Sequence, residues 1–426
     1  MVYKKMSKEL SKLLNEIGLN AKKASAVLNT ATTDQKNSFF DFAIKAIQED
    51  SDAILQANQI DIKQAEENKK DTAFIDRLAL DKSRLQGICE TLAEIKSFKD
   101  PVGKILASWK RPNGLNISRV TTPLGVIGLI FESRPNVAAD AGGLCLKSGN
   151  AVILRSGKDG LRSASAIVNS LQNALVGSNL PKECIQIVPS ESREAATIML
   201  KGINGSIDVI VPRGGKSLVA EVERSARVPV FGHLEGICHI YVDEHADEEK
   251  ALSVCINAKM RRTGICGAVE TILVHENIAA SFVPKLVASL SGLECEIRCC
   301  EKTISFDNRA VPASEEDWST EYLAPIVSVK SASSIDEAIS HIERFGTGHT
   351  ESIISENKDA QSKFTNSIDS AIVMINTSTQ FADGGEFGLG GEIGIATGKF
   401  HARGPVGVDQ LTSFKYIVSG DGQIRD

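Results

Sequence analysis

Val126-Ile-Gly-Leu-Ile-Phe131 is a nearly continuous apolar run, and it is the first of a series of short runs that determine the fold. Val/Ile/Leu-rich runs of this kind are typical of strands that are buried on both faces. Similar runs follow at 151–154, 185–188 and 207–211, separated by stretches with helical spacing. Strands that alternate with helices of about 10–15 residues predict a parallel sheet covered by helices. A second such series runs from 239 to 375, so we expect two doubly wound α/β lobes.

The first hundred residues are predicted to be helical, with an N-cap at Thr33 or Asp34 before the apolar series that begins at Phe39. A hairpin is then predicted at 105–120, because its two apolar runs flank an Asn-Gly pair that favours a tight turn. A hairpin inserted at this place is a candidate for an arm that joins subunits. The C-terminal run 411–418 alternates loosely and is a candidate to pair with this arm across the subunit interface.

Composition excludes several classes of protein. A chain of 426 residues is expected to form two or three domains, and 42% hydrophobic with 24% charged residues is typical of globular proteins. No run approaches the roughly 18–20 apolar residues of a membrane span. A net charge of −6 without a basic stripe, and only 5% aromatics, argue against nucleic-acid binding. An odd number of cysteines, nine, and no apolar leader favour the reducing cytoplasm.

The stretch most informative about function is Ala258-Lys-Met-Arg-Arg-Thr-Gly-Ile-Cys-Gly267. A cysteine acts as a nucleophile only as thiolate, which requires nearby positive charge or backbone N–H groups and partial exposure. Glycines on either side of Cys266 allow a sharp turn, and a buried strand follows at 271–274. The alternative is a buried, inert thiol, which is the prediction for most of the other cysteines. Their spacing predicts no metal site. The cations expected to stabilise the thiolate are Lys259, Arg261 and Arg262.

Two turns are candidates for binding phosphate groups. Pro212-Arg-Gly-Gly-Lys216 follows the strand at 207–211 and precedes a helix, so its backbone N–H groups and the helix N-terminus can face an anion. Its alternative is an ordinary connection between strand and helix. Leu154-Arg-Ser-Gly-Lys158 places two further cations directly after a strand. Ligands of parallel sheets bind at the carboxyl ends of the strands, which is where both turns lie.

Nine motifs spread over some 280 residues resemble the gamma-glutamyl phosphate reductases, a branch of the aldehyde dehydrogenase superfamily. The motifs are Pro123-Leu-Gly-Val-Ile-Gly128, Glu132-Ser-Arg-Pro-Asn136, Leu146-Lys-Ser-Gly-Asn-Ala-Val-Ile-Leu154, Val211-Pro-Arg-Gly-Gly-Lys216, Arg261-Arg-Thr-Gly-Ile-Cys266, Thr320-Glu-Tyr322, Phe345-Gly-Thr-Gly-His349, Phe381-Ala-Asp-Gly-Gly-Glu-Phe-Gly-Leu-Gly390 and His401-Ala-Arg-Gly-Pro405.

The resemblance implies an aldehyde-dehydrogenase-like α/β fold with a β-arm for oligomerisation. It implies the NADPH-dependent reduction of L-glutamyl 5-phosphate to L-glutamate 5-semialdehyde and phosphate through a cysteine thioester, the second step of proline biosynthesis from glutamate. The expected parts are an NADP-binding domain at 1–104 and 121–232, a catalytic domain at 233–383, an oligomerisation element at 105–120 and 403–426, and a return segment at 384–402 near the cofactor domain.

The resemblance also assigns residues. Cys266 is the nucleophile, and Glu321 matches the glutamate that binds the nicotinamide ribose. Lys158 stands where many NAD-dependent relatives have an acid, which favours NADPH. At Ser133 relatives have an oxyanion-hole asparagine, and at His233 they have a water-activating glutamate, although Glu235 lies close enough to leave that assignment open. The full set expected to bind the cofactor is Arg155, Lys158, Arg213, Gly214, Gly215, Lys216 and Glu321; Arg134, Asn136 and Arg261 are expected to bind the substrate, with Arg403 a weaker candidate.

Two rival functions follow from the same residues. An NAD-dependent semialdehyde dehydrogenase that forms a free acid is disfavoured by His233 and Lys158, and a non-catalytic relative is disfavoured by Cys266. Expected partners are further copies of the chain and the small-molecule acyl phosphate, and a glutamate 5-kinase is a candidate partner that channels this labile substrate to the chain.

Overall fold

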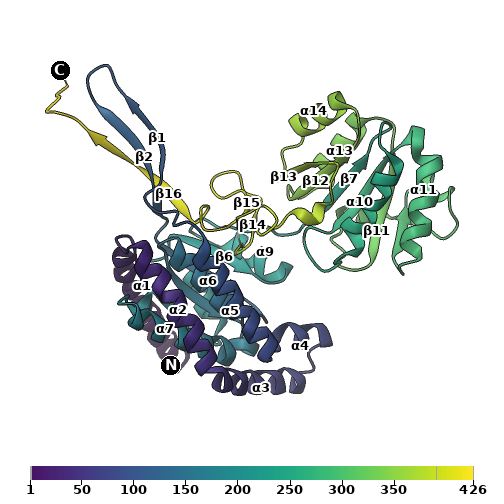
Figure 1. Ribbon diagram of the computed structural model, residues 1–426. Helices are drawn as coiled ribbons and strands as arrows, with labels where there is room; N and C mark the ends of the chain where they lie inside the picture. The colour runs from purple at the N-terminus through teal and green to yellow at the C-terminus, as the bar shows by residue number, and fades with distance from the viewer. Residues whose placement is uncertain (1, 390, 426) are drawn as a thin grey trace. The chain divides into compact units, whose positions relative to one another are not determined.

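The computed structural model describes residues 2–389 and 391–425. They form two compact units (Figure 1): unit 1 comprises Met1–Gly232, Leu389–Gly394 and Val406–Asp426, and unit 2 comprises His233–Gly388 and Ile395–Pro405. The segment 384–402, expected to return to the cofactor domain, is divided, since Leu389–Gly394 belongs to unit 1 and its flanks to unit 2. No helix among the described residues has both the length and the apolar character that crossing a bilayer requires.

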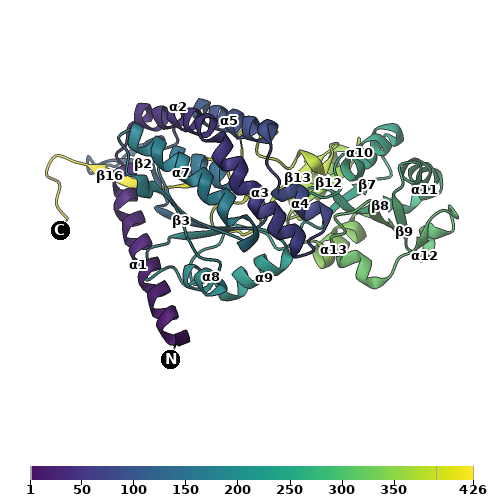
Figure 2. The same ribbon diagram turned by 90° about the horizontal axis from the view of Figure 1, so that it is seen from below.

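The N-terminal third of unit 1 is helical, as predicted. Thr32, one residue before the expected position, caps α2, and Gln35 completes a capping box with it. The buried face of α2 includes Phe39, Phe40 and Ile47. The helices of this layer are α1 (Val2–Leu28), α2 (Thr33–Glu49), α3 (Ser51–Glu67), α4 (Thr72–Leu78) and α5 (Lys82–Ser97); Figure 2 shows α2, α3 and α5 together with α7.

The sheet of unit 1 is parallel with strand order β5-β4-β3-β6, which confirms the predicted α/β arrangement. Chain order reverses at β3, because β4 lies on one side of it and β6 on the other. Such a reversal opens a crevice at the carboxyl ends of the strands. The elements are β3 (Val126–Phe131), β4 (Ala151–Ser156), β5 (Ile185–Ile187), β6 (Val209–Arg213), α6 (Val137–Lys147), α7 (Leu161–Gly177), α8 (Arg193–Leu200) and α9 (Lys216–Ser225).

Both faces of this sheet are covered. On one face α6 lies between the sheet and the outer helices, because a side chain at Gly142 would contact Ile185 of β5 and one at Gly143 would contact Leu92 of α5. The next residue of β5, Gln186, points to the opposite face. There its side-chain amide donates to the Ile17 carbonyl of α1 at 3.0 Å.

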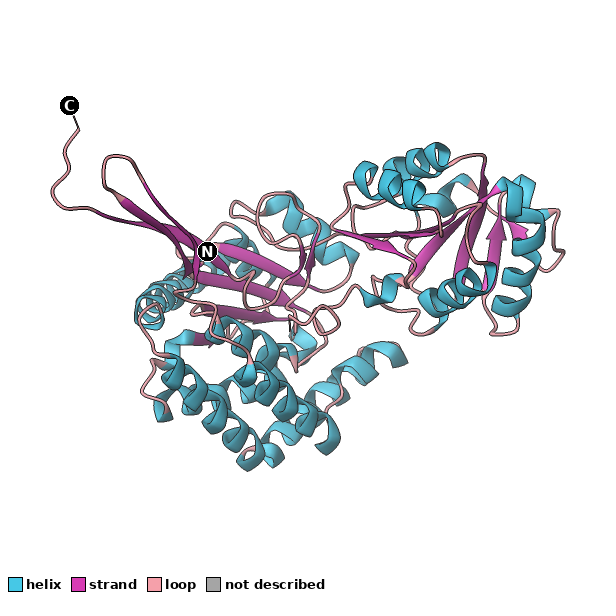
Figure 3. Cartoon of the chain, turned by 45° about the horizontal axis from the view of Figure 1, so that its top comes forward, coloured by secondary structure: helices cyan, strands magenta, loops and turns pink. Residues whose placement is uncertain are grey.

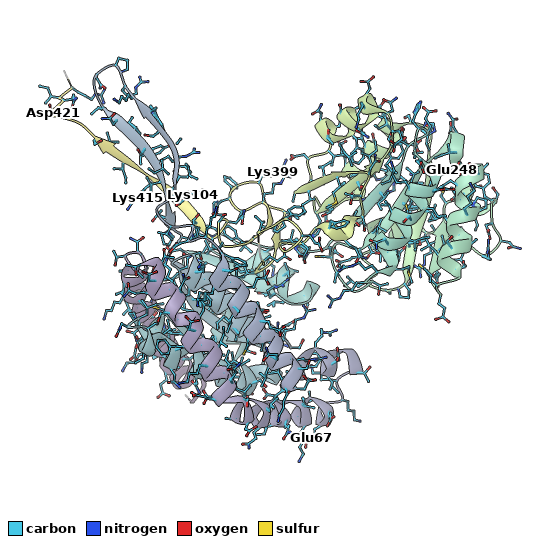
Figure 4. The ribbon with its side chains drawn as sticks, viewed as in Figure 1. Glu67, Lys104, Glu248, Lys399, Lys415 and Asp421 are labelled. Atoms are coloured by element: carbon cyan, nitrogen blue, oxygen red, sulfur yellow. The ribbon has the colours of Figure 1, made fainter. Side chains whose placement is uncertain are left out.

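A separate three-stranded antiparallel sheet of unit 1 is formed by β1 (Ile105–Lys110), β2 (Asn116–Pro123) and β16 (Thr412–Ser419), in the order β1-β2-β16. The predicted hairpin is therefore confirmed. The prediction that the C-terminal run pairs across a subunit interface is wrong, because β16 pairs with β2 of its own chain along eight residues, from Thr412↔Pro123 to Ser419↔Asn116. Figure 4 shows Lys104 and Lys415 at this sheet.

Unit 2 has a parallel seven-stranded sheet of order β10-β9-β11-β8-β7-β12-β13 with helices on both faces (Figure 3). Ile240 and Ile272 pack into an apolar cluster with α10 and α11, whereas their neighbours Tyr241 and Leu273 pack with α13 and α14. The elements are β7 (Cys238–Val242), α10 (Glu248–Met260), β8 (Val269–His275), α11 (Glu276–Ser291), β9 (Glu296–Cys299), α12 (Glu301–Ile304), β10 (Val311–Pro312), β11 (Ile326–Ala332), α13 (Ile335–Phe345), β12 (Thr350–Ile354), α14 (Lys358–Ser367) and β13 (Ile372–Ile375); β14 (Ile395–Ala396) and β15 (Gly404–Pro405) form a small hairpin.

Apolar side chains on the three-stranded sheet predict association between copies of the chain. Tyr416, Ile417 and Val418 are about half exposed, and because successive residues of a strand point to opposite faces, both faces of the sheet carry apolar surface. We expect light scattering at micromolar concentration to give a mass above that of one chain. Ile417→Lys combined with Val418→Lys should lower that mass, whereas Val176→Lys, at a 62% exposed position of α7, should not. A full-length protein that is already monomeric would contradict this prediction.

Candidate active site

Cys266 lies in the loop between α10 and β8 of unit 2, immediately before the amino end of β8. It is one of two partly exposed thiols, together with Cys300, and the other seven cysteines are buried. The segments before β7 and β12 reach the same edge, because the three strands are parallel and lie in the order β8-β7-β12. The thiol therefore lies at the amino ends of the strands of its sheet, not at the carboxyl ends.

Gly236, two residues before β7, lies directly against the cysteine loop. A Cβ atom at this position would stand 2.3 Å from the Cys266 carbonyl oxygen and 2.7 Å from its Cβ atom. The Gly236 N–H donates to Oε1 of Glu321 at 2.9 Å. The Cys238 thiol of β7 donates to the Cys266 carbonyl at 3.1 Å. These contacts fix the backbone that carries the Cys266 thiol.

Two histidines complete the surroundings of the thiol. A ring nitrogen of His233, a ring nitrogen of His349 and Sγ of Cys266 all lie within 4.8 Å of one another. Since the Ile395 carbonyl can only accept, Nδ1 of His233 donates to it, at 2.7 Å. Between His233 and Glu235, which the sequence left open, the ring of His233 is the one in this cluster.

His349 is completely buried, and its Nδ1 lies 2.9 Å from the Thr350 hydroxyl. Its Nε2 has no hydrogen-bond partner. Burial, assisted by the neighbouring His233, lowers the pKa of His349 to about 3. The ring is therefore neutral at physiological pH. Sequence reasoning placed His349 in a motif but gave it no role.

The Lys259 ammonium group has a carboxylate partner that the sequence did not predict. Its ammonium group is buried and bonds to the Glu270 carboxylate at 2.5 Å. Burial raises the pKa of Glu270 to about 7, although Lys259 opposes this. Arg261 and Arg262 are exposed, and Arg261 donates to the Gln380 side chain at 3.3 Å. The cations of this segment thus have other partners or face solvent.

Unit 1 contains a cavity of about 760 Å³ at the strand reversal of its sheet. Arg155, at the end of β4, lines it and is 8% exposed. Its Nη2 donates to the Ser192 carbonyl at 3.5 Å, while Nε is buried without a partner. Lys158 lines the same cavity and is exposed. The structure therefore brings together at one cavity two of the four cations that the sequence assigned to the cofactor.

The glycine-rich turn after β6 has a different neighbour from the one expected. The Gly215 N–H donates to Oε2 of Glu132 at 3.1 Å, and a Cβ atom at Gly214 would stand 2.7 Å from the same oxygen. A carboxylate of the chain thus occupies the position predicted for a phosphate oxygen. Arg213 ends β6, and the side chain of Lys216 lies outside the described residues.

The predicted substrate-binding residues are distributed over both units. Arg134 is exposed in the loop after β3 of unit 1. Asn136, in the same loop, donates to the Asp140 carboxylate at 2.8 Å. Arg261 belongs to unit 2, as does Arg403, which binds Asp369 at 2.6 Å. Arg403 therefore stabilises the β14–β15 region of unit 2.

Comparison with known proteins gives a consistent family. The aldehyde dehydrogenase family matches residues 4–303 and 308–417. The chain is 54% identical over 420 residues to the gamma-glutamyl phosphate reductase of Brucella suis, covering 99% of this chain and 100% of that protein. The crystal structure of gamma-glutamyl phosphate reductase from Thermotoga maritima is similar with a TM-score of 0.95 and 43% identity, covering 97% of this chain and 100% of that one. An acetylating aldehyde dehydrogenase from Geobacillus thermoglucosidasius, 16% identical with a TM-score of 0.68 over 99% of both chains, shares the fold. The resemblance and the aldehyde-dehydrogenase-like α/β fold inferred from the sequence are confirmed, and the role of the β-arm in oligomerisation stays a prediction.

The contact between Gly236 and the cysteine loop predicts that substitutions of two glycines, Gly236 and Gly264, differ in their effect on the stability of the protein. Gly236→Ala should lower the free energy of unfolding by about 1–3 kcal/mol, because the added methyl group overlaps backbone. It should also change the rate at which iodoacetamide alkylates Cys266. Gly264→Ala is the matched control, since a Cβ atom there meets nothing within 4 Å. Urea denaturation and mass spectrometry measure both effects. Equal stability of the two variants would contradict the contact.

Burial of His349 predicts an acid-labile contribution to stability. Its folded-state pKa of about 3 lies below the ordinary value of 6.5, so between these pH values the unfolded chain binds a proton that the folded chain does not. The free energy of unfolding should therefore fall as pH falls through this window, by about 1.4 kcal/mol per pH unit from this group. His349→Asn should reduce the measured slope by that amount in urea denaturation at several pH values. An unchanged slope would show that His349 is protonated in the folded protein.

Proposed function

The chain belongs to the aldehyde dehydrogenase family, and we propose that it reduces L-glutamyl 5-phosphate to L-glutamate 5-semialdehyde with NADPH. The observation that carries the proposal is the partly exposed Cys266, on a loop that lies against Gly236, in a chain that is 54% identical to a gamma-glutamyl phosphate reductase. The reduction is the second step of proline biosynthesis from glutamate, and the acyl phosphate is supplied by a kinase that phosphorylates glutamate. All nine cysteines are free thiols, which fits the reducing cytoplasm.

Cofactor binding, the chemistry of the thiol and oligomerisation are assigned to different parts of the chain. We assign cofactor binding to 1–104 and 121–232 and the chemistry of the thiol to 233–383. The segments 105–120 and 403–426 are assigned to oligomerisation, which the exposed apolar residues of β16 support.

The first chemical step is attack of the Cys266 sulfur on the acyl carbon, which forms a carbon–sulfur bond and breaks the carbon–oxygen bond to phosphate. His233 is suited to accept the thiol proton. Because its Nδ1 donates to the Ile395 carbonyl, the neutral ring carries its proton there and Nε2 is an acceptor. The backbone N–H of Cys266 is a candidate donor to the oxyanion.

The second step is reduction of the thioester. When bound, NADPH supplies the hydride for this step. Collapse of the resulting thiohemiacetal releases the aldehyde and returns the thiol of Cys266. A histidine at 233 in place of the glutamate of hydrolytic relatives favours exchange of the thioester with phosphate over hydrolysis.

The residues of the unit 1 cavity fit a phosphorylated dinucleotide. The buried Nε of Arg155 has no partner within the protein, and Lys158 adds an exposed cation at the same cavity. We assign these two residues to the 2′-phosphate. Glu321 is assigned to the nicotinamide ribose, Arg213 and Lys216 to the pyrophosphate region, and Arg134, Asn136 and Arg261 to the substrate. The cofactor can bind the backbone of Gly214 and Gly215 only when the Glu132 carboxylate moves away from the Gly215 N–H, to which it is hydrogen-bonded.

The proposed reaction is tested by phosphate-dependent reduction of NADP by glutamate semialdehyde. Cys266→Ser should lower turnover by several orders of magnitude while NADPH still binds, because an alcohol without a strong base is a poor nucleophile. Cys300→Ser, which changes the other partly exposed thiol, should leave turnover intact. Turnover by the wild type that does not require phosphate would instead identify a hydrolytic dehydrogenase.

Cofactor preference is tested at Lys158. A charge-assisted hydrogen bond contributes roughly 1.5–3 kcal/mol, so Lys158→Glu should lower kcat/KM for NADPH about tenfold or more and leave NADH nearly unaffected. Lys182→Glu, at an exposed position before β5, controls for a general change of charge. An unchanged ratio of NADPH to NADH efficiency in Lys158→Glu would move the 2′-phosphate site to Arg213 and Lys216.

A further inference from the structure

The cluster of Cys266, His233 and His349 has a second chemical capacity besides nucleophilic attack. One thiol and two imidazoles are the ligand types that zinc-like cations prefer. Their three ligand atoms lie within 4.8 Å of one another on three neighbouring segments of unit 2. We propose that these residues form a reversible site for a thiophilic divalent cation such as Zn²⁺, and that an ion bound there inhibits the chain by occupying the sulfur of Cys266.

The spacing is close to that of a tetrahedral site. Zinc binds sulfur at about 2.3 Å and imidazole nitrogen at about 2.0–2.1 Å, which places the ligand atoms of one ion roughly 3–4 Å apart. The observed upper limit of 4.8 Å therefore requires a movement of about 1 Å, within reach of small side-chain rotations. Three protein ligands leave a fourth position for water or a phosphate oxygen.

Both imidazoles are held in the way that metal-binding histidines usually are. Such a histidine binds the ion through one ring nitrogen while the other nitrogen is fixed by a protein oxygen. Nδ1 of His233 is fixed by the Ile395 carbonyl at 2.7 Å, and Nδ1 of His349 lies 2.9 Å from the Thr350 hydroxyl. In both rings this assigns Nε2 as the ligand.

The unsatisfied nitrogen of His349 is an independent indication. Nε2 is completely buried and has no hydrogen-bond partner, and a buried polar group in this state costs free energy that a bound ion recovers.

The probe for this site is Co²⁺, added to the purified full-length chain under anaerobic conditions. A thiolate ligand gives a sulfur-to-cobalt charge-transfer band in the near ultraviolet, and Zn²⁺ should abolish the band by displacement. The band should be absent in Cys266→Ser and retained in Cys300→Ser. His349→Asn should weaken cobalt binding at least about tenfold, since even loss of a residue that only orients a ligand costs about 10–100-fold.

A second measurement needs no variant. Stoichiometric Zn²⁺ should protect Cys266 of the wild type from iodoacetamide but leave Cys300 reactive, and a chelator should reverse the protection. Absence of the cobalt band, its persistence in Cys266→Ser, or equal protection of both thiols would overturn the proposal. Only the inhibitory consequence depends on the proposed reaction, so a chain that binds cobalt through Cys266 but does not turn over would contradict the reaction and not the site.

Discussion

The buried ion pair between Lys259 and Glu270 is the constraint on which the geometry around the thiol depends. Lys259 belongs to the end of α10 and Glu270 to the start of β8, so the pair holds both ends of the loop that carries Cys266. The Leu323 N–H donates to the other oxygen of Glu270 at 3.3 Å, and Glu321, two residues before Leu323, accepts a hydrogen bond from the Gly236 N–H. Gly236 in turn lies against Cys266. Removing one partner of a fully buried pair typically costs about 3–5 kcal/mol, so the loop is strongly held.

The charged groups around the cysteine loop are arranged differently from the sequence prediction. Helix α10 ends before the cysteine loop, and the end of a helix presents the negative side of its dipole, which does not favour a thiolate. The cations nearest in sequence are bound elsewhere or exposed. Of the two imidazoles near the Cys266 sulfur, His233 is the one proposed above to accept the thiol proton, because burial lowers the pKa of His349 to about 3 and disfavours a proton on that ring.

The sequence predicted features that depend on local pattern. Strands β3 and β8 follow from continuous apolar runs, and the β1–β2 hairpin follows from its Asn-Gly turn. Contacts between distant residues were missed. The sequence around Lys259 does not indicate that its ammonium group forms an ion pair with Glu270, eleven residues further along the chain. His349 reaches the thiol only because β12 neighbours β7 in the sheet, and the Glu132 carboxylate at Gly215 joins residues 83 positions apart. Such pairs carry no periodic signal, so only the topology reveals them.

The pairing of β2 with β16 has a consequence for biosynthesis. Pro123 pairs with Thr412, and the Asn150 side chain donates to the Leu411 carbonyl across 261 positions of sequence. A ribosome adds about 5–20 residues per second, so the outer edge of β2 waits for its neighbour for tens of seconds after it emerges. During that time it is an open strand edge next to apolar side chains, which is available for pairing with the strand of another chain. The last strand synthesised is thus the one that closes this edge. A chain that lacks its last few tens of residues keeps the edge of β2 open.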